Sequence, residues 1–201
     1  MTRCRTAFFV LSLPFSVHAA VAQAPHERLI ALAADGSVLA TIDGGATSAA
    51  IGTALDQVLR RADAHVRLTH NHPASTGLSA ADLEQLTKPG VDAIEAIGSD
   101  GSRYEARRGP RYDPVFFESH QYEPVDLEVG RRLAAAAKSA ADRSCFDAHR
   151  AHITAIALHK AGVIVYHAAL SPDRSASYER YRPAFGPAAE ISAARVRASL
   201  R

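Results

Sequence analysis

The sequence predicts an α/β (α+β) fold, in which a mixed β-sheet is flanked by helices and followed by a helical C-terminal extension. Two Asp-Gly pairs, Asp35-Gly36 and Asp100-Gly101, each separate two short apolar runs, and such a pair is a strong signal for a β-hairpin. Between these hairpins apolar residues recur at helical spacing, and the last third of the chain has the pattern of helices. The expected order is therefore hairpin, helix, strand, helix, hairpin and helical extension.

The segments between the two hairpins have distinct patterns. Residues 47–61 place their apolar side chains on one helical face, which predicts an amphipathic helix. Residues 65–69 alternate and run into His70-Asn71-His72, and Pro73 ends this strand because proline has no N–H to donate. Residues 79–87 begin the next helix. A strand therefore delivers two histidines at its end.

The second half of the chain changes character. Residues 109–125 hold three prolines and four aromatic residues, which predicts a surface connector. Residues 126–201 form the expected helical extension, with one helical face from Val129 to Ala140 and a second helix at 146–161. The next stretch, 162–170, fits either a strand or a further helical turn. The tail from Pro172 is rich in arginine, which indicates a solvated and frayed end.

The N-terminus has the organisation of a secretory signal peptide. Two arginines precede an apolar run at 7–17 and a small-x-small site, Ala20-Val21-Ala22. We expect residues 1–22 to be this signal, with cleavage before Gln23, a folded domain at 23–108, and a periplasmic or secreted product. The alternative is a short helix that packs on the domain, in which case the protein is cytoplasmic.

Composition excludes several other classes of protein. The 23 basic and 21 acidic residues are interspersed, so we expect no nucleic-acid partner. No segment after the signal approaches the ~18 apolar residues of a membrane span, so we expect none in the mature form. The two cysteines, Cys4 and Cys145, build neither a disulfide framework nor a thiolate cluster. A chain of this length folds without a structural metal, so a metal here would be catalytic.

The chemistry is concentrated in residues 70–82. Residues two apart on a strand share a face, so His70 and His72 can bind one ion, and Asp82 lies in the first turn of the following helix. Two histidines and a carboxylate are the ligands of a catalytic zinc site with one open position, so Zn²⁺ is the expected cofactor. Amide hydrolysis also needs a proton carrier, and Glu27 is the one glutamate that precedes His70.

These residues resemble the JAMM metalloproteases, also called JAB or MPN domains. That family has a glutamate on an early strand, then H-x-H, a loop and S-x-x-D, and the match covers about residues 27–107. The HNHP motif followed by S-x-x-D-L is most similar to the bacterial branch of the family, which includes the RadC-like proteins and the JAB domains of toxin-associated systems. The loop between His72 and Ser79 has six residues, where many family members have seven.

The resemblance implies a zinc-dependent metallopeptidase or isopeptidase that acts on a protein or peptide substrate. It implies that zinc is bound by His70, His72 and Asp82, that Glu27 is the general acid/base, and that the Ser79 hydroxyl stabilises the tetrahedral oxyanion. The main alternative is a catalytically silent scaffold that binds a protein partner. All five motif positions are present, and a scaffold has no physical need for them, so we favour the enzyme. The oligomeric state is left open.

Each part of the motif also has a structural explanation. Ser79 and Asp82 fit an acidic variant of a helix capping box, and the histidines fit polar residues at a strand end. The conjunction of all parts in one order favours the metal site. Elsewhere, His149, His152 and His159 are expected on a solvated helix face, and the arginines at 103–111 are expected to be solvated.

Overall fold

The computed structural model describes residues 21, 24, 26–45 and 50–199. The expected signal peptide therefore lies outside the described residues, apart from Val21. The described part contains six strands: β1 (Arg28–Leu32), β2 (Val38–Asp43), β3 (Val66–His72), β4 (Val91–Gly98), β5 (Arg103–Arg108) and β6 (Ile164–Ala169). It also contains the helices α2 (Thr53–Leu59), α3 (Ala80–Glu84), α4 (Glu123–Ala136), α5 (Ala140–Ala161) and α6 (Pro172–Ser199).

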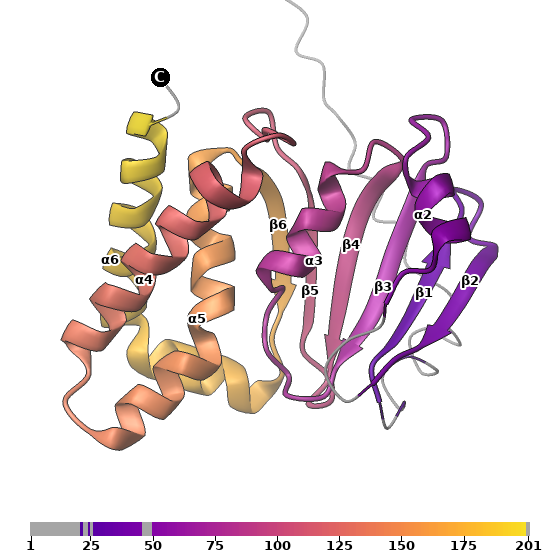
Figure 1. Cartoon of the computed structure of the whole chain (residues 1–201). Coiled ribbons are helices and arrows are strands. Elements are labelled where there is room, and N and C mark those ends of the chain that lie inside the picture. Colours follow the sequence, from indigo (N-terminus) through magenta and orange to yellow (C-terminus); the bar gives the residue numbers. More distant parts are fainter. Residues whose placement is uncertain (1–20, 22–23, 25, 46–49, 200–201) are drawn as a thin grey trace, which may run out of the picture.

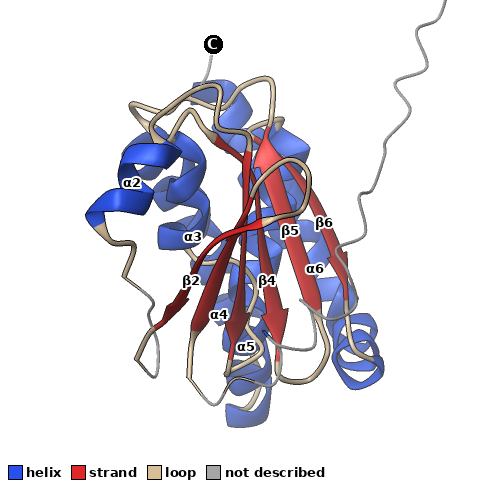
Figure 2. Cartoon of the chain, turned by 90° about the vertical axis from the view of Figure 1, so that its right-hand side faces the viewer, coloured by secondary structure: helices blue, strands red, loops and turns tan. Residues whose placement is uncertain are grey.

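The strands form one mixed sheet in the order β2-β1-β3-β4-β5-β6. The pair β3–β4 is parallel and every other pair is antiparallel. Helix α2 lies over the β1 and β3 end of the sheet, α3 lies over β4 and β5, and α4, α5 and α6 pack together beside β6 (Figure 1). Figure 2 shows the strands in front of these three helices. The predicted fold class is thus confirmed.

Both predicted hairpins are present. Gly36 and Gly101 have φ angles of 84° and 85°, a conformation that glycine adopts without a steric penalty. In each turn the aspartate Oδ1 accepts a hydrogen bond of 2.9 Å from a serine N–H two residues later. The two turns, Asp35-Gly36-Ser37 and Asp100-Gly101-Ser102, therefore have the same local chemistry. The predicted strand and helix between them are also present as β3 and α3.

The second half differs from expectation in two places, and in a third it decides between the two structures that the sequence left open. Within the expected connector, a π-helical turn, Phe117–Tyr122, leads directly into α4. The ambiguous stretch at 162–170 contains β6, which pairs with β5 and extends the sheet. The expectation of a frayed tail is wrong, because α6 packs against α4 and α5 and buries side chains such as Phe185 and Val196.

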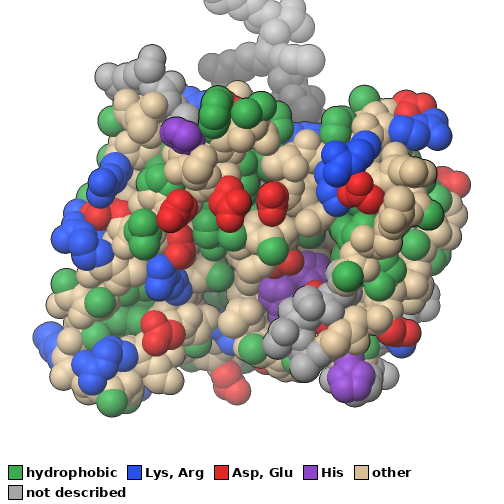
Figure 3. Space-filling model, viewed as in Figure 1, with side chains coloured by type: hydrophobic (Ala, Val, Ile, Leu, Met, Phe, Trp, Pro, Cys, Tyr) green, Lys and Arg blue, Asp and Glu red, His purple; other side chains and the backbone are tan. Residues whose placement is uncertain are grey.

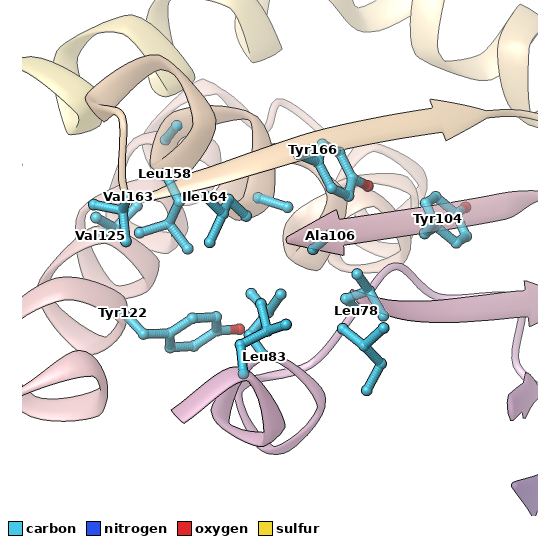
Figure 4. Packing of buried hydrophobic residues seen from close by; sticks show 14 of the residues in the cluster. Leu78, Leu83, Tyr104, Ala106, Tyr122, Val125, Leu158, Val163, Ile164 and Tyr166 are labelled. Atoms are coloured by element: carbon cyan, nitrogen blue, oxygen red, sulfur yellow. The ribbon is translucent and has the colours of Figure 1, made fainter. Parts of the chain in front are cut away.

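One hydrophobic core joins the motif region to the C-terminal region. Leu78 and Leu83, which lead into and belong to α3, point toward Ala106 of β5 and Ile164 and Tyr166 of β6 (Figure 4). All of these residues belong to a single cluster of buried residues that also includes α5 and α6. A smaller cluster consists of Val21, Ile30, Leu32 and Ile97. The described helices include none that is long and apolar enough to cross a membrane.

Candidate metal centre

Strand β3 delivers the two histidines to the helix-covered face of the sheet. Side chains alternate along a strand, so His70 and His72 share the face of Leu68, a core residue. His70 is paired with Leu29 of β1 on one side and with Ala96 of β4 on the other, and its side chain is only 1% exposed. The strand therefore holds His70 rigidly, while His72, at its end, is 12% exposed.

Helix α3 brings Asp82 to the same point. The Nε2 atom of His70 lies 3.0 Å from Asp82 Oδ1, and that of His72 lies 3.3 Å from Asp82 Oδ2. The two Nε2 atoms are 2.8 Å apart. The structure thus brings together all three residues that the sequence predicts as ligands, and in the described part of the chain they are the one such group of histidine, cysteine or acidic side chains.

The donor set fits a zinc ion. Zinc bonds to histidine nitrogen and carboxylate oxygen are each about 2.0–2.2 Å long, so two ligand atoms of a tetrahedral site lie about 3.3 Å apart. The two Nε2 atoms are 2.8 Å apart, and each lies 3.0 or 3.3 Å from a different oxygen of the Asp82 carboxylate. One ligand atom from each residue would leave the fourth tetrahedral position to water or substrate, as in catalytic zinc sites.

Hydrogen bonds orient the histidine at the end of β3. The Nδ1–H of His72 donates to the carbonyl oxygen of Thr76 at 2.9 Å, which leaves the Nε2 lone pair directed at the centre. The Nδ1 atom of His70 is buried and has no hydrogen-bond partner among the described residues, so packing within the sheet orients this ring. Two imidazole lone pairs so close repel each other unless a proton or a cation lies between them.

Ser79 orients Asp82, the third predicted ligand. It is the N-cap of α3: its Oγ accepts a hydrogen bond from Asp82 N at 3.2 Å, and its own N–H donates to Asp82 Oδ2 at 2.6 Å. Its hydroxyl also donates to Asp82 Oδ2 at 2.7 Å. The capping box is therefore present, and it orients the Asp82 carboxylate toward the histidines. Ser79 also lines the cleft above the centre.

The charges of the three residues are coupled. Burial opposes ionisation of Asp82, but hydrogen bonds and charge from His70 and His72 outweigh it and hold the pKa of this carboxyl far below its usual range. Burial also opposes protonation of His72, yet Asp82, the Thr76 carbonyl and the charge of Glu27 raise its pKa. Asp82 is therefore a carboxylate at neutral pH, as a metal ligand must be.

Glu27 lines the same cleft as the three ligands. This cleft has a volume of about 510 Å³, and apolar side chains, including Leu29, Ile51 and Ile94, form part of its wall. Figure 3 shows histidine surface on the face that carries α2 and α3. The backbone of Glu27 extends the β1–β2 ladder, since its N–H donates to Gly45 O at 3.0 Å and its carbonyl accepts from Gly44 N at 2.8 Å. The glutamate thus belongs to the site.

Asn71 is a site residue that the sequence reasoning missed. It lies between the two histidines, so its side chain points to the opposite face, where it is only 2% exposed. Its Oδ1 accepts from Arg28 N at 2.6 Å, and its Nδ2 donates to the carbonyl oxygens of Ala24 and His26 at 3.2 and 3.0 Å. It therefore fixes the backbone on both sides of Glu27. A third polar residue between the two histidines was the available signal.

Three basic residues that were expected to face solvent contact other parts of the protein. The prediction of a solvated face for His149 and His152 is wrong, because they are only 2% and 5% exposed. His152 Nδ1 lies 2.8 Å from the Tyr166 hydroxyl. The rings of His149 and His152 both pack against Tyr178 of α6. The expectation of solvated arginines is wrong for Arg108, which donates to three carbonyl oxygens at 86–89.

Comparison with known proteins does not identify the family, because no family model, curated protein or solved structure matches this chain.

Proposed function

We propose that this protein is a zinc-dependent metallohydrolase that cleaves a peptide or isopeptide bond. The observation that carries the proposal is the convergence of His70, His72 and Asp82, with Glu27 on the wall of the same cleft. The order of these residues along the chain resembles the JAMM metalloproteases, and this resemblance supports amide hydrolysis over other zinc chemistry. When bound, zinc lowers the pKa of water to near 7 and so supplies a nucleophile at neutral pH.

The protein's own residues transfer the proton, stabilise the oxyanion and contact the substrate. The Glu27 carboxylate accepts the proton of the attacking water and returns it to the leaving amine, which leaves poorly unless it is protonated. The Ser79 hydroxyl, released from Asp82, donates to the developing oxyanion. The apolar wall formed by Leu29, Ile51 and Ile94 contacts the side chains of a peptide beside the scissile bond. We propose a protein or peptide as the substrate, and a periplasmic or secreted location.

The test of this function is the variant Glu27→Gln. Glutamine has nearly the same volume but cannot transfer a proton, so the variant is expected to retain zinc and to lose hydrolysis by at least about 10²-fold. Cleavage is measured by mass spectrometry on a mixture of linear and isopeptide-linked peptides. Wild-type cleavage should disappear with a chelator and return with added zinc.

Glu84→Gln is the matched control, because Glu84 lies on α3 but is exposed and does not line the cleft. It should retain wild-type activity. Equal activity of the Glu27→Gln variant and wild type would remove Glu27 from the mechanism. A zinc-loaded wild type that cleaves nothing in the mixture would contradict the hydrolase and favour the scaffold that binds a protein partner.

A further inference from the structure

The turn that follows His72 is held by the β4–β5 hairpin. The carbonyl oxygen of His72 accepts from Ser75 N at 2.9 Å and from Ser99 N at 3.3 Å. The Ser99 hydroxyl donates to Pro73 O at 2.9 Å. The same turn carries the Thr76 carbonyl that orients the His72 ring. Any shift of this turn would therefore move the imidazole relative to His70 and Asp82.

Ser75 makes most of the hydrogen bonds that join this turn to the β4–β5 hairpin. Its φ of 53° lies in the left-handed region, which is unfavourable for a residue with a side chain and requires support from its surroundings. That support is present: the Oγ atom accepts from Asp100 N at 3.0 Å and lies 3.0 Å from Ser99 Oγ. Its carbonyl oxygen accepts from the Tyr104 hydroxyl at 3.3 Å.

Asp100 connects this hairpin to the C-terminal helix. Its Oδ2 accepts from Ser102 Oγ at 3.1 Å, from Ser171 Oγ at 3.1 Å and from Arg174 Nε at 3.0 Å. Arg174 also donates to Ala148 O of α5 at 3.0 Å, and its side chain is only 13% exposed. One carboxylate thus joins the hairpin to the start of α6, and one guanidinium joins both to α5.

Close packing leaves the turn little freedom. A Cβ atom on Gly98 would lie 2.6 Å from Asp100 Oδ1 and 3.0 Å from the Cβ atom of Ser75. A Cβ atom on Gly77 would lie 2.9 Å from the backbone nitrogen of His152 in α5. The segment that follows His72 is therefore enclosed between the β4–β5 hairpin and α5, the same two elements that Arg174 and Asp100 join.

We propose that Asp100 and Arg174 are positioning residues for the metal centre, and that the C-terminal helices hold the His72 turn through them. The connection runs from Arg174 to Asp100, from Asp100 to Ser75, and from the Ser75 turn to His72. This inference rests on the proposed metal centre and adds to it a role for the C-terminal region. Residues that orient metal ligands from outside the ligand set contribute about 10–100-fold to metal affinity.

The test measures Co²⁺ affinity by chelator competition, together with the visible absorption of bound Co²⁺, which reports ligand geometry. Asp100→Asn keeps the volume of the side chain, and Arg174→Ala removes the guanidinium. Each is expected to weaken Co²⁺ binding by about 10-fold or more and to alter the spectrum. Arg174→Lys keeps a cation and is expected to lose less affinity than Arg174→Ala.

Two matched controls separate this role from general loss of stability. Asp35→Asn changes the same position in the other Asp-Gly-Ser turn, where the carboxylate bonds Ser37 without reaching a helix. Arg182→Ala removes an exposed arginine of α6 that pairs with Glu179 on the same helix. Both controls should bind Co²⁺ within twofold of wild type. All measurements are made at a temperature at which circular dichroism shows each variant folded. If Arg174→Ala does not fold, Arg174→Gln takes its place.

The outcomes distinguish this inference from the proposed function. If wild type binds Co²⁺, and Asp100→Asn and Arg174→Ala have Co²⁺ affinities within twofold of wild type and an unchanged spectrum, the positioning role is overturned. The metal centre is then unaffected. A loss of affinity in Asp100→Asn alone would overturn the part played by the C-terminal helix. A wild-type protein that binds no Co²⁺ would overturn both the metal centre and the positioning role.

Discussion

Asn71 shows how one side chain on the far face of β3 serves a site on the near face. Its three hydrogen bonds hold the backbone of Ala24, His26 and Arg28, and Glu27 lies between the last two. The position of Glu27, the proposed proton carrier, thus depends on a residue that does not line the cleft. The two histidines on either side of Asn71 face Asp82, so residues 70–72 position both the proposed ligands and the proposed base.

We therefore predict that Asn71→Ala retains zinc but lowers kcat by about 10-fold or more, because the residues on either side of Glu27 lose three hydrogen bonds. The variant should also be less stable by about 1–3 kcal/mol, the cost of unsatisfied buried groups. Thr69→Val is the control, because Thr69 is buried on the same face but its side chain bonds Glu95. Equal kcat for the two variants, with zinc measured in both, would contradict the role of Asn71.

At this scale the sequence was informative where chemistry follows from spacing along the chain. His70, His72 and Asp82 lie within thirteen consecutive positions, and local rules for strands and caps bring them together. Asp100 was predictable as a turn residue, but its partner Arg174 lies 74 positions away, so its second role was not predictable from the turn. Long-range hydrogen bonds of this kind depend on the tertiary fold.

At the scale of elements, α5 also has features that depend on residues distant in the sequence. The pattern at 146–161 predicted the C-terminal part of this helix, which Gly162 ends with a φ of 80°, but the helix begins earlier, at Ala140. The burial of His149 and His152 was not predictable from α5 alone, because Tyr178 and Phe185 of α6 pack against them. Likewise, β6 became a strand through its pairing with β5, which a local apolar pattern does not determine.

The buried histidines predict that acid destabilises the protein. Burial lowers the pKa of His149 to about 4 and that of His152 to about 3, and the nearby cation Arg174 acts in the same direction. The unfolded histidines titrate near 6.5, so below that pH the unfolded chain binds protons that the folded chain does not. Stability is therefore retained above about pH 6.5 and is lost as the pH falls toward 4.

Urea unfolding between pH 7 and 5, with a chelator present to exclude effects of metal loss, tests this prediction. Each histidine should contribute a slope of up to about 1.4 kcal/mol per pH unit. The double variant His149→Gln, His152→Gln should flatten the pH dependence, whereas His167→Gln, an exposed position on β6, should not change it. A double variant with the wild-type slope would show that other groups dominate acid unfolding.

At the scale of the whole molecule, the motif region and the C-terminal region share one core. Tyr104 and Ala106 of β5 belong to the same buried cluster as Ile164 of β6, Leu158 of α5 and Phe185 of α6. We predict that residues 23–108 alone do not fold, because this fragment leaves one face of β5 and the edge that pairs with β6 without partners. Residues 23–201 should fold cooperatively.

Near-ultraviolet circular dichroism and amide proton dispersion of the two polypeptides provide the measurement. The prediction is native signal for residues 23–201 and none for residues 23–108. A folded fragment that binds zinc would show that the motif region is an autonomous domain, and would contradict the proposed role of the C-terminal helices.

The most direct test of the central claim is the zinc content of the purified protein, measured by elemental analysis after exposure to zinc and removal of the excess. We predict about one zinc per chain in wild type and in His167→Ala, an exposed-histidine control, and no bound zinc in Asp82→Ala or in the double variant His70→Ala, His72→Ala. Circular dichroism establishes that each variant is folded. Wild type without zinc, or equal zinc in wild type and the double variant, would contradict the metal centre.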